Sequence, residues 1–432
     1  MVVPHRINGK NVVRKTFRLE SIFDPSCSLE LARYTEDDKK EVMAKSFAGY
    51  SSSRFRRGLL GRLAEFVPSP EAVECAAVFT GMPIRIINER ITEGRALARS
   101  FADLVTDGGE KGKSFFAAIP SNDAREPYFF VANALVANAQ GVLKPSRKEP
   151  LITLEMVRYL ESCGLSAGYF NVIHGDSSNS EDVALLAMTR SSKDISIVMG
   201  NQSFEKDREV VYSADHTRAI VIDPAVAIPH LRLSVENPLS CLAEHNYVVV
   251  GEEARNAVVD ALVEIYSSLD SDNPSLLEGR KGQIERETLV QLAAMLNQGI
   301  VHDTMRVSSP GTLRERTLSP DDVARGMVVE HFTNDPRVPP NPLLTSPLPA
   351  YITGVRCVPS IEQAIQDLEE ARWRLPTRKS MAIAVYGNLP SAYDARLEAL
   401  AYEVHRNKSP SSMRGIVHQG IDLREILRRG AQ

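Results

Sequence analysis

The stretch "GVLKPSRKEPLITLEMVRYLESCGLSAGYFNVIHG", residues 141–175, decides the fold. It opens with a short strand-like run, "GVLKPS", which a proline stops. Residues 151–163 then place apolar side chains at helical spacing, and a second strand-like run, "FNVIHG", ends at a glycine. A strand, a helix and a strand in this order are typical of a parallel sheet with helical connections.

The same alternation continues on both sides of this stretch. Upstream, "SFFAAIP" (114–120) predicts a strand and 125–138 a helix; downstream, helix 179–190, capped by Asn179 or Ser180, precedes the strand "ISIVMG" (195–200). Before them, a hairpin at "HRINGKNV" (5–12) introduces an opening third that reads as helical. Its expected helices are 36–49, 54–66, 70–80 and 85–105.

A second α/β unit follows in the other half of the chain. Its expected strands are "RAIVID" (218–223), "NYVVV" (246–250), "GMVVEHF" (326–332), "AYITGVRCV" (350–358) and "MAIAVYG" (381–387). Its expected helices are 252–269, 284–298, 360–373 and 391–404. The proline-rich run 334–349 predicts a loop or extended connector. A length of 432 residues agrees with two or three domains.

Composition narrows the class of protein. The chain is 43% hydrophobic and 25% charged with a net charge of −4, which argues against a long disordered tail and against nucleic acid as a partner. No apolar run approaches the length of a membrane helix, and the N-terminus reaches a charged residue too early for a signal peptide, so we expect a cytoplasmic protein. Five cysteines without CxxC spacing or nearby histidines predict reduced thiols and no metal site: Cys27, Cys75, Cys163, Cys241 and Cys357.

Three residues fall where the predicted parallel strands end: Lys144, Gly175 and Gly200. Ligands of such sheets sit beyond the carboxyl ends of the strands, where helix N-termini present free N–H groups. The pattern therefore favours a phosphate-bearing ligand at this edge. A glycine after a strand also occurs simply as a turn, and both interpretations of the glycines stay open.

Read in order from about residue 7 to 420, these segments resemble the aldehyde dehydrogenase superfamily. The stretch 141–175 resembles the family's Lys-Pro-Ser strand, its helix and the following turn; "AIPSN" (118–122) resembles its Pro-x-Asn segment, and "CLAEHNYVVV" (241–250) the segment that starts at its nucleophile. The resemblance implies an α/β fold, aldehyde dehydrogenase-like, with two doubly wound parallel-sheet domains and a reduced oligomerisation element.

The resemblance also implies domains and roles. Residues 1–215 would be an N-terminal helical segment and a dinucleotide-binding, Rossmann-like domain, 216–405 a catalytic α/β domain carrying Cys241, and 406–432 a C-terminal return segment. Cys241 would be the nucleophile and Asn122 an oxyanion donor. A thiolate that attacks a carbonyl needs such a preorganised donor. Without the resemblance, the favoured interpretation of Cys241 is a buried structural thiol, since free cysteine packs like a small hydrophobe.

The implied cofactor is NAD or NADP. Lys144 would meet its ribose hydroxyls or phosphate, Ser146 and Gly175 would line the adenosine side, and Gly200 with Asn201 would lie at the pyrophosphate. Arg147, where many members have glutamate, hints at the extra phosphate of NADP. His174 and His245 lie close to these positions in sequence, and we interpret them as turn or surface histidines.

Departures from the family pattern shape the functional prediction. Tyr212 stands where the family has its general-base glutamate, and Leu343 where a glutamate grips the nicotinamide ribose. Without the base, acyl-thioester reduction or an acylating dehydrogenase is favoured over hydrolytic aldehyde oxidation. The substrate would be a small aldehyde or acyl thioester. The alternative is a non-catalytic relative that serves as a binding or scaffold subunit; a homodimer or a heteromeric partner is expected in place of a conventional tetramer.

Overall fold

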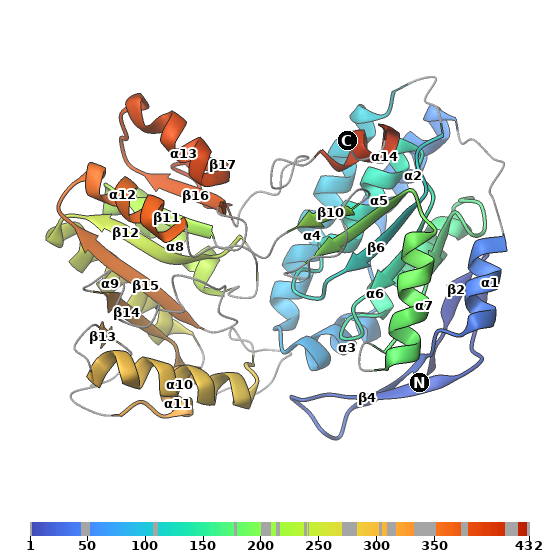
Figure 1. The fold of residues 1–432 in the computed structure, drawn as a ribbon, viewed down its shortest axis with the longest axis horizontal. Coiled ribbons are helices and arrows are strands. Elements are labelled where there is room, and N and C mark those ends of the chain that lie inside the picture. Colours follow the sequence, from blue (N-terminus) through green and yellow to red (C-terminus); the bar gives the residue numbers. More distant parts are fainter. Residues whose placement is uncertain are drawn as a thin grey trace. The chain divides into compact units, whose positions relative to one another are not determined.

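The computed structural model describes residues 2–44, 52–106, 111–176, 179–199, 209–212, 217–236, 240, 242–269, 283–301, 305–308, 317–331, 351–372, 379–410 and 422–429. The chain forms two compact units (Figure 1). Unit 1 consists chiefly of Met1–Tyr212 and Ile416–Gln432. Unit 2 consists chiefly of Ser213–Ser275 and Gly279–Gly415.

Unit 1 is built on a seven-stranded sheet of order β10-β9-β6-β7-β8-β2-β3. Its strands are β2 (His5–Ile7), β3 (Lys10–Val12), β6 (Phe115–Ile119), β7 (Gly141–Pro145), β8 (Phe170–Val172), β9 (Ile195–Met199) and β10 (Glu209–Tyr212). The strands from β10 to β8 are parallel, and β2 and β3 form the expected hairpin at one edge. Asn8 and Gly9 adopt positive φ angles of 49° and 76° in its turn, a conformation that these two residue types tolerate best.

Helices cover both faces of this sheet. They are α1 (Glu36–Ala44), α2 (Ser53–Glu65), α3 (Pro70–Thr80), α4 (Ile84–Phe101), α5 (Glu126–Ala137), α6 (Leu151–Ser162), α7 (Ser180–Ser191) and α14 (Leu423–Arg429). α5 contacts α2, α4, α6 and α14, and every one of its residues is buried. α1 and α7 pack on the opposite face, where Val42 and Leu185 join a core with Phe116 and Val142. The predicted arrangement of a parallel sheet between helices is confirmed.

Arg56 ties two of these helices together. Its side chain is 2% exposed, and Nη1 donates to the carbonyls of Leu135 and Val136 at 3.3 and 2.7 Å. These carbonyls belong to the last turn of α5, where the C=O groups have no N–H donor within the helix. A buried guanidinium therefore satisfies the C-terminus of the central helix.

The opening third is not wholly helical, which corrects the sequence interpretation. β1 (Val2–Val3), β4 (Thr16–Glu20) and β5 (Ser28–Ala32) form a small sheet of order β1-β5-β4. β4 alternates half-buried and exposed residues, so one of its faces stays in water. Such an edge strand carries a weak apolar signal, which its charged residues mask.

Unit 2 has a second seven-stranded sheet, of order β13-β14-β15-β12-β11-β16-β17, parallel except for β13. Its strands are β11 (Thr217–Val221), β12 (Glu244–Val250), β13 (Met305–Ser308), β14 (Met327–His331), β15 (Ile352–Val358), β16 (Ser380–Tyr386) and β17 (Ala401–Arg406). Its helices are α8 (Pro224–Glu236), α9 (Glu252–Ser268), α10 (Arg286–Val301), α11 (Pro320–Arg325), α12 (Ile361–Arg372) and α13 (Asp394–Leu400). α8 and α9 bury one face of the sheet, and α12 and α13 the other.

One expected helix of this unit ends early. The prediction of a helix over 391–404 is wrong beyond Leu400, because Ala401–Arg406 form strand β17 beside β16. Pairing with a neighbouring strand overrides the local helical spacing. Among the described residues, no helix combines the length and apolarity that crossing a membrane would need.

Candidate functional site

The carboxyl ends of β6, β7 and β8 form one edge of the unit 1 sheet. Ile119 of β6 pairs with Pro145 of β7, and Leu143 of β7 pairs with Val172 of β8, so the three strands end at nearly the same level. The chain runs from β6 through β7 to β8, then returns to place β9 on the other side of β6. The order of strands therefore reverses between β6 and β9, and open α/β sheets bind ligands beyond such a reversal.

Asn122 lies in the loop that leaves β6 at this reversal. It is half-buried and comes three residues after Ile119. The next residues hold the loop by a buried ion pair: Nε of Arg125 donates to both carboxylate oxygens of Asp123, at 3.0 and 2.9 Å. The N–H of Arg125 also donates to Asp123 Oδ1, at 2.9 Å. Asn122 is thus attached to a loop that cannot rearrange without breaking a buried pair.

The ion pair extends into helix α4. Nη1 of Arg125 and Nη1 of Arg90 each lie 2.8 Å from Oε2 of Glu93. Burial would raise the pKa of Asp123, but the charge and hydrogen bonds of Arg125 outweigh it and hold that pKa at about 2. Asp123 is therefore ionised throughout the physiological range.

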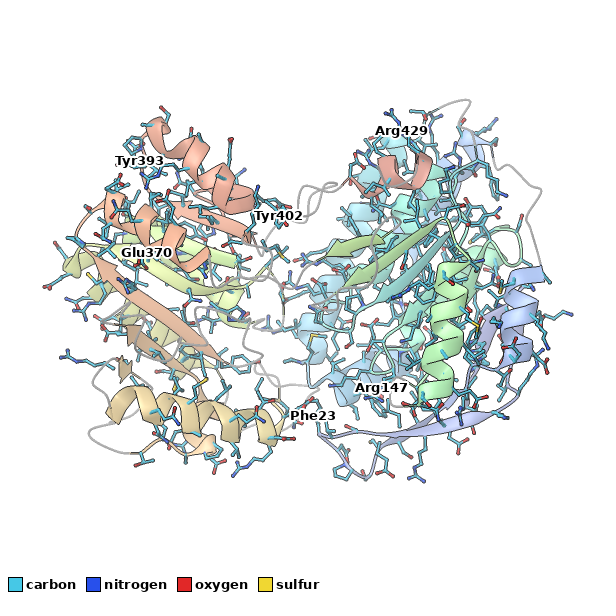
Figure 2. All side chains as sticks on the ribbon, in the orientation of Figure 1. Phe23, Arg147, Glu370, Tyr393, Tyr402 and Arg429 are labelled. Carbon is cyan, nitrogen blue, oxygen red and sulfur yellow. The ribbon has the colours of Figure 1, made fainter. Side chains whose placement is uncertain are left out.

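Lys144 and Ser146 lie on either side of the last residue of β7. Lys144 is half-buried, and burial lowers its pKa, with Arg147 lowering it further. The side chain of Arg147 (Figure 2) is 40% exposed, and its Nη1 lies 3.4 Å from Oδ1 of Asp176, which follows β8. Two basic groups thus lie at the end of β7, and an acidic group follows β8. The basic pair suits an anionic ligand.

Glu149 is a buried acidic residue in the loop that follows β7. It is 3% exposed, its N–H donates to the carbonyl of Ser146 at 3.1 Å, and its Oε2 has no hydrogen-bond partner among the described residues. Burial first, and the charge of Asp123 second, raise the pKa of Glu149 well above its ordinary value. Burial and the charge of Asp123 therefore both favour the protonated form of Glu149.

His174 follows β8 and is buried, which corrects its interpretation as a turn or surface histidine. Its N–H donates to Nδ1 of His5 at 3.0 Å, its Nε2 lies 3.1 Å from the carbonyl of Pro4, and the two imidazole rings stack at 5.6 Å. Burial lowers the pKa of His5 to about 4 and that of His174 well below its usual value. The pair fastens the N-terminal strand to the carboxyl end of β8 as neutral rings.

Gly175 is buried against helix α7. A Cβ at this position would lie 2.8 Å from Cδ1 of Leu186, the end of a flexible side chain that would have to shift, so packing favours glycine here. The N–H of Asp176 donates a hydrogen bond to Oδ2 of Asp182 at 2.9 Å. The other carboxylate oxygen of Asp182 accepts a hydrogen bond from Nε of Arg33 at 2.7 Å. The packing explanation and the predicted adenosine contact are compatible at Gly175.

Three predicted site residues lie outside the described residues: Cys241, Gly200 and Asn201. The neighbours of Cys241 in unit 2 are described. The N–H of Leu242 donates to Ser240 Oγ at 3.3 Å, and the N–H of Ala243 to the carbonyl of Ser240 at 3.0 Å. His245 is also buried, 4% exposed, so its interpretation as a surface or turn residue is wrong.

Glu244, the first residue of β12, is the hub of a buried hydroxyl cluster. Its carboxylate accepts hydrogen bonds from Ser409 Oγ at 2.9 Å, from Ser234 and from the hydroxyl of Tyr386. A register shift between Thr217 and Arg218 of β11 breaks the regular pairing at this end of β12. Burial raises the pKa of Glu244 although these hydroxyls act against it.

The structure brings four of the predicted residues to one edge of unit 1: Asn122, Lys144, Ser146 and Gly175. Sequence reasoning missed the Asp123–Arg125 pair, Glu149 and Glu244. Opposite charges two residues apart before a predicted helix were a usable signal for the pair. Glu149 and Glu244 offered none, because their burial depends on distant helices and strands. Among the described residues no group of histidine, cysteine and acidic side chains could hold a metal ion.

Comparison with known proteins agrees with this geometry. A model of the aldehyde dehydrogenase family matches residues 127–204, which contain helix α5 except for its first residue, strands β7 to β9 and the Lys144 loop. A putative aldehyde dehydrogenase from Burkholderia cenocepacia superposes with a TM-score of 0.74 at 19% identity, covering 94% of this chain and 89% of that one. The chain has the aldehyde dehydrogenase fold. The resemblance to this superfamily predicted from the sequence is confirmed.

Two further aldehyde dehydrogenase structures are similar over almost their whole length. One is an indole-3-acetaldehyde dehydrogenase mutant of P. syringae in complex with NAD+ and IAA, with a TM-score of 0.75, 17% identity, and coverage of 96% of this chain and 90% of that one. The other is a salicylaldehyde dehydrogenase from Pseudomonas putida G7 complexed with salicylaldehyde, with a TM-score of 0.75, 14% identity, and coverage of 97% and 92%. No match was found among curated protein sequences.

Proposed function

We propose that this aldehyde dehydrogenase-like chain is an NAD(P)-dependent oxidoreductase that acts on an aldehyde or an acyl thioester through Cys241. The observation that carries the proposal is the placement of Asn122, Lys144 and Ser146 at one sheet edge, beside the point where strand order reverses. The family-model match over 127–204 and the NAD+ and aldehyde complexes of similar structures support the same reading.

The residues at this edge fit a dinucleotide. Neither α5 nor α6 receives a side-chain cap hydrogen bond from its N-cap residue, whereas α7 is capped by Asn179. Uncapped N–H groups at a helix N-terminus attract phosphate. Lys144 would hold the ribose or phosphate, and Ser146 would accept or donate a hydrogen bond on the adenosine side. When bound, the nicotinamide would accept or supply the hydride.

The chain's own residues would carry the remaining steps. The Cys241 thiolate would attack the aldehyde carbon, forming a C–S bond and an alkoxide, and the side-chain amide of Asn122 would donate to that oxygen. Loss of hydride turns this thiohemiacetal into a thioester on Cys241. Transfer of the acyl group from Cys241 to an external thiol would then regenerate the free Cys241 thiol. The same steps in reverse would reduce an acyl thioester to an aldehyde.

The choice of acyl transfer over hydrolysis rests on Tyr212. It is the last residue of β10 and pairs with Met199 of β9, at the same carboxyl edge of the sheet. The family has its general-base glutamate at this sequence position, and a tyrosine lacks the carboxylate that would activate water at neutral pH. We therefore propose an acylating dehydrogenase or acyl-thioester reductase.

Steady-state turnover tests this proposal directly. With an aldehyde panel, NAD+ or NADP+, and coenzyme A as the external thiol, Cys241→Ser should abolish turnover while Cys163→Ser, on another part of the chain, leaves it unchanged. Omitting the thiol should stop the wild type after one turnover, because hydrolysis is slow. Unchanged turnover of Cys241→Ser would rule out the proposed nucleophile.

A second proposal, a non-catalytic binding or scaffold subunit, draws its support from Tyr212 together with Leu343, where the family has a ribose-gripping glutamate. Leu343 lies outside the described residues. This alternative predicts a folded protein that turns over no aldehyde and no acyl thioester with either nicotinamide. Turnover above that of the Cys241→Ser variant would exclude it.

A further inference from the structure

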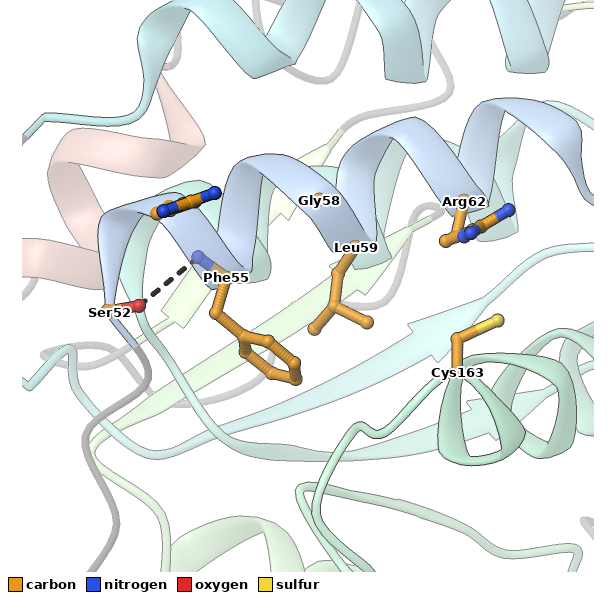
Figure 3. Close-up of a pocket in the computed structure, with 7 residues that line it drawn as sticks. Ser52, Phe55, Gly58, Leu59, Arg62 and Cys163 are labelled. Atoms are coloured by element: carbon orange, nitrogen blue, oxygen red, sulfur yellow. Dashed lines mark hydrogen bonds between the residues drawn. The ribbon is translucent and has the colours of Figure 1, made fainter.

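Helix α2 carries a pocket on the outer side of unit 1, distant in sequence from the candidate active site (Figure 3). Its volume is about 370 Å³, and all but one of the residues that line it belong to α2 or its N-cap. The exception is Cys163, which follows α6 and faces α2 in the close-up view. Neither the proposed reaction nor the family resemblance uses this pocket.

Gly58 is the unusual residue of this pocket. It lies inside α2, is exposed, and a Cβ built on it would meet no atom within 4 Å. A glycine inside a helix costs about 1 kcal/mol relative to alanine. Neither a positive φ angle nor a close neighbour explains the glycine here. Because Gly58 has no side chain, an external group can approach the helix backbone closely at this position.

Two arginines flank this glycine along the helix. Arg54, Gly58 and Arg62 follow the i, i+4, i+8 spacing of one ridge on a helix surface, so the glycine leaves a notch between two guanidinium groups. Arg54 forms no ion pair with any described residue, and Arg62 pairs with Glu65 at 2.9 Å on the exposed surface. An exposed pair of this kind contributes at most about 1 kcal/mol, so a ligand can displace it.

Ser52 adds a hydroxyl group, which accepts a hydrogen bond from the N–H of Phe55, and apolar side chains form the other part of the lining. Phe55 is 36% exposed and Leu59 is buried, and both belong to the ridge beside the notch. Among the described residues that line the pocket, none is acidic. A ligand that fits both the basic and the apolar part of the pocket carries an anionic head, which binds the arginines, and an apolar body, which packs on the phenylalanine and leucine.

We propose that this pocket binds an organic anion with an apolar body, its carboxylate or phosphate head seated over Gly58 between Arg54 and Arg62. Guanidinium groups bind either head through paired hydrogen bonds. The apolar body lies over Phe55 and Leu59 and ends near the thiol of Cys163. The inference is independent of the proposed redox function.

The test uses decanoate as the probe and Cys163 as the reporter. Decanoate should slow the alkylation of Cys163 by iodoacetamide, read by peptide mass spectrometry, and leave Cys27, which is also half-buried, unaffected. Decanol tests the need for the charge, and acetate tests the need for the apolar body. Neither should protect Cys163.

Matched variants locate the site. Gly58→Leu should abolish the protection, while Gly61→Leu, at the other open glycine of α2 but outside the pocket, should retain it. Arg54→Gln combined with Arg62→Gln should weaken decanoate binding about tenfold or more, the loss expected for charge-assisted hydrogen bonds. Both glycine variants increase helix propensity, so a loss confined to Gly58→Leu cannot come from misfolding.

Three results would overturn the proposal. They are equal protection in Gly58→Leu and the wild type, protection by decanol as strong as that by decanoate, and protection by phosphatidylglycerol vesicles without any by free decanoate. The last result would assign the pocket to a lipid surface in place of a soluble anion. Protection by decanoate that requires Gly58 and the two arginines would establish the site.

Discussion

Asp123 and Arg125 form a buried ion pair immediately after Asn122, with Nε of Arg125 3.0 and 2.9 Å from the two carboxylate oxygens. Only one residue separates the partners, so the pair fixes the local backbone more than it joins distant elements. Through Glu93 it is also attached to α4. The loop that presents the proposed oxyanion donor is therefore anchored by charge as well as by packing.

Breaking the Asp123–Arg125 ion pair should lower the free energy of unfolding substantially. Asp123→Asn leaves the guanidinium of Arg125 buried with a neutral neighbour, and removal of one member of a buried ion pair destabilises a protein by about 3 kcal/mol or more. We expect a loss of that size in the free energy of unfolding, measured by urea denaturation. Asp103→Asn, at an exposed site, should change it little. Equal effects of the two substitutions would show that the pair does not stabilise the loop.

The sequence predicted the order of strands and helices around the site well. Residues 114–200 show strong periodicity in short segments bounded by glycine and proline, and α3, α6 and β7 fall within one residue of their expected bounds. The predicted positions of Lys144 and Gly175 at one edge follow from this order alone, because parallel strands align their carboxyl ends. Asn122 and Ser146 were predicted from the family resemblance.

What escaped prediction depends on contacts between distant segments. The burial of His5 and His174 requires the N-terminal strand to pack beside β8, which is more than 160 positions away. β17 forms because β16 offers it a partner, although its sequence continues a helical pattern. The raised pKa of Glu149 arises from burial and from the charge of Asp123, neither of which the local sequence reveals.

The histidine pair predicts a stability that depends on pH. Burial lowers the pKa of His5 to about 4 in the folded protein, so its contribution is complete above the unfolded pKa of about 6.5 and is lost as the pH falls towards 4. Between pH 7 and pH 5 the wild type should lose about 2 kcal/mol from this group alone.

His5→Gln checks this assignment, because glutamine can still accept the hydrogen bond from the His174 N–H but does not titrate. The variant should show a smaller loss of stability between pH 7 and pH 5 in urea denaturation. His230→Gln, in unit 2, serves as the control and should keep the wild-type dependence. A His5→Gln variant with the full wild-type slope would contradict the burial argument.

Glu149 should show the opposite dependence. Its folded pKa is raised, so the folded state holds a proton that the unfolded state releases above about 4.5, and stability falls as the pH rises through the folded pKa. Glu149→Gln mimics the neutral acid and should be more stable than the wild type at pH 8, with a smaller advantage at pH 5. Exposed Glu74→Gln should show no such trend. A variant less stable at pH 8 would mean that Glu149 is ionised.

Substitution of Gly175 tests whether packing against Leu186 explains the glycine at this position. Gly175→Ala should lower the free energy of unfolding by about 1 kcal/mol, because the new methyl group forces Cδ1 of Leu186 to shift. Leu186→Ala makes room for it, so the double variant should be destabilised by less than the sum of the single changes, a coupling that a double-mutant cycle measures. Strict additivity would show that Leu186 is not the reason for glycine at this position.

Titration of the purified protein with NADH and NADPH, followed by nicotinamide fluorescence, tests the central claim most directly. The account predicts saturable binding of at least one of the two, weakened about tenfold or more by Lys144→Gln, since a charged contact to the cofactor is lost. Lys40→Gln, at an exposed position of α1, should bind as the wild type does. Absence of binding of both nucleotides at millimolar concentration would contradict the account.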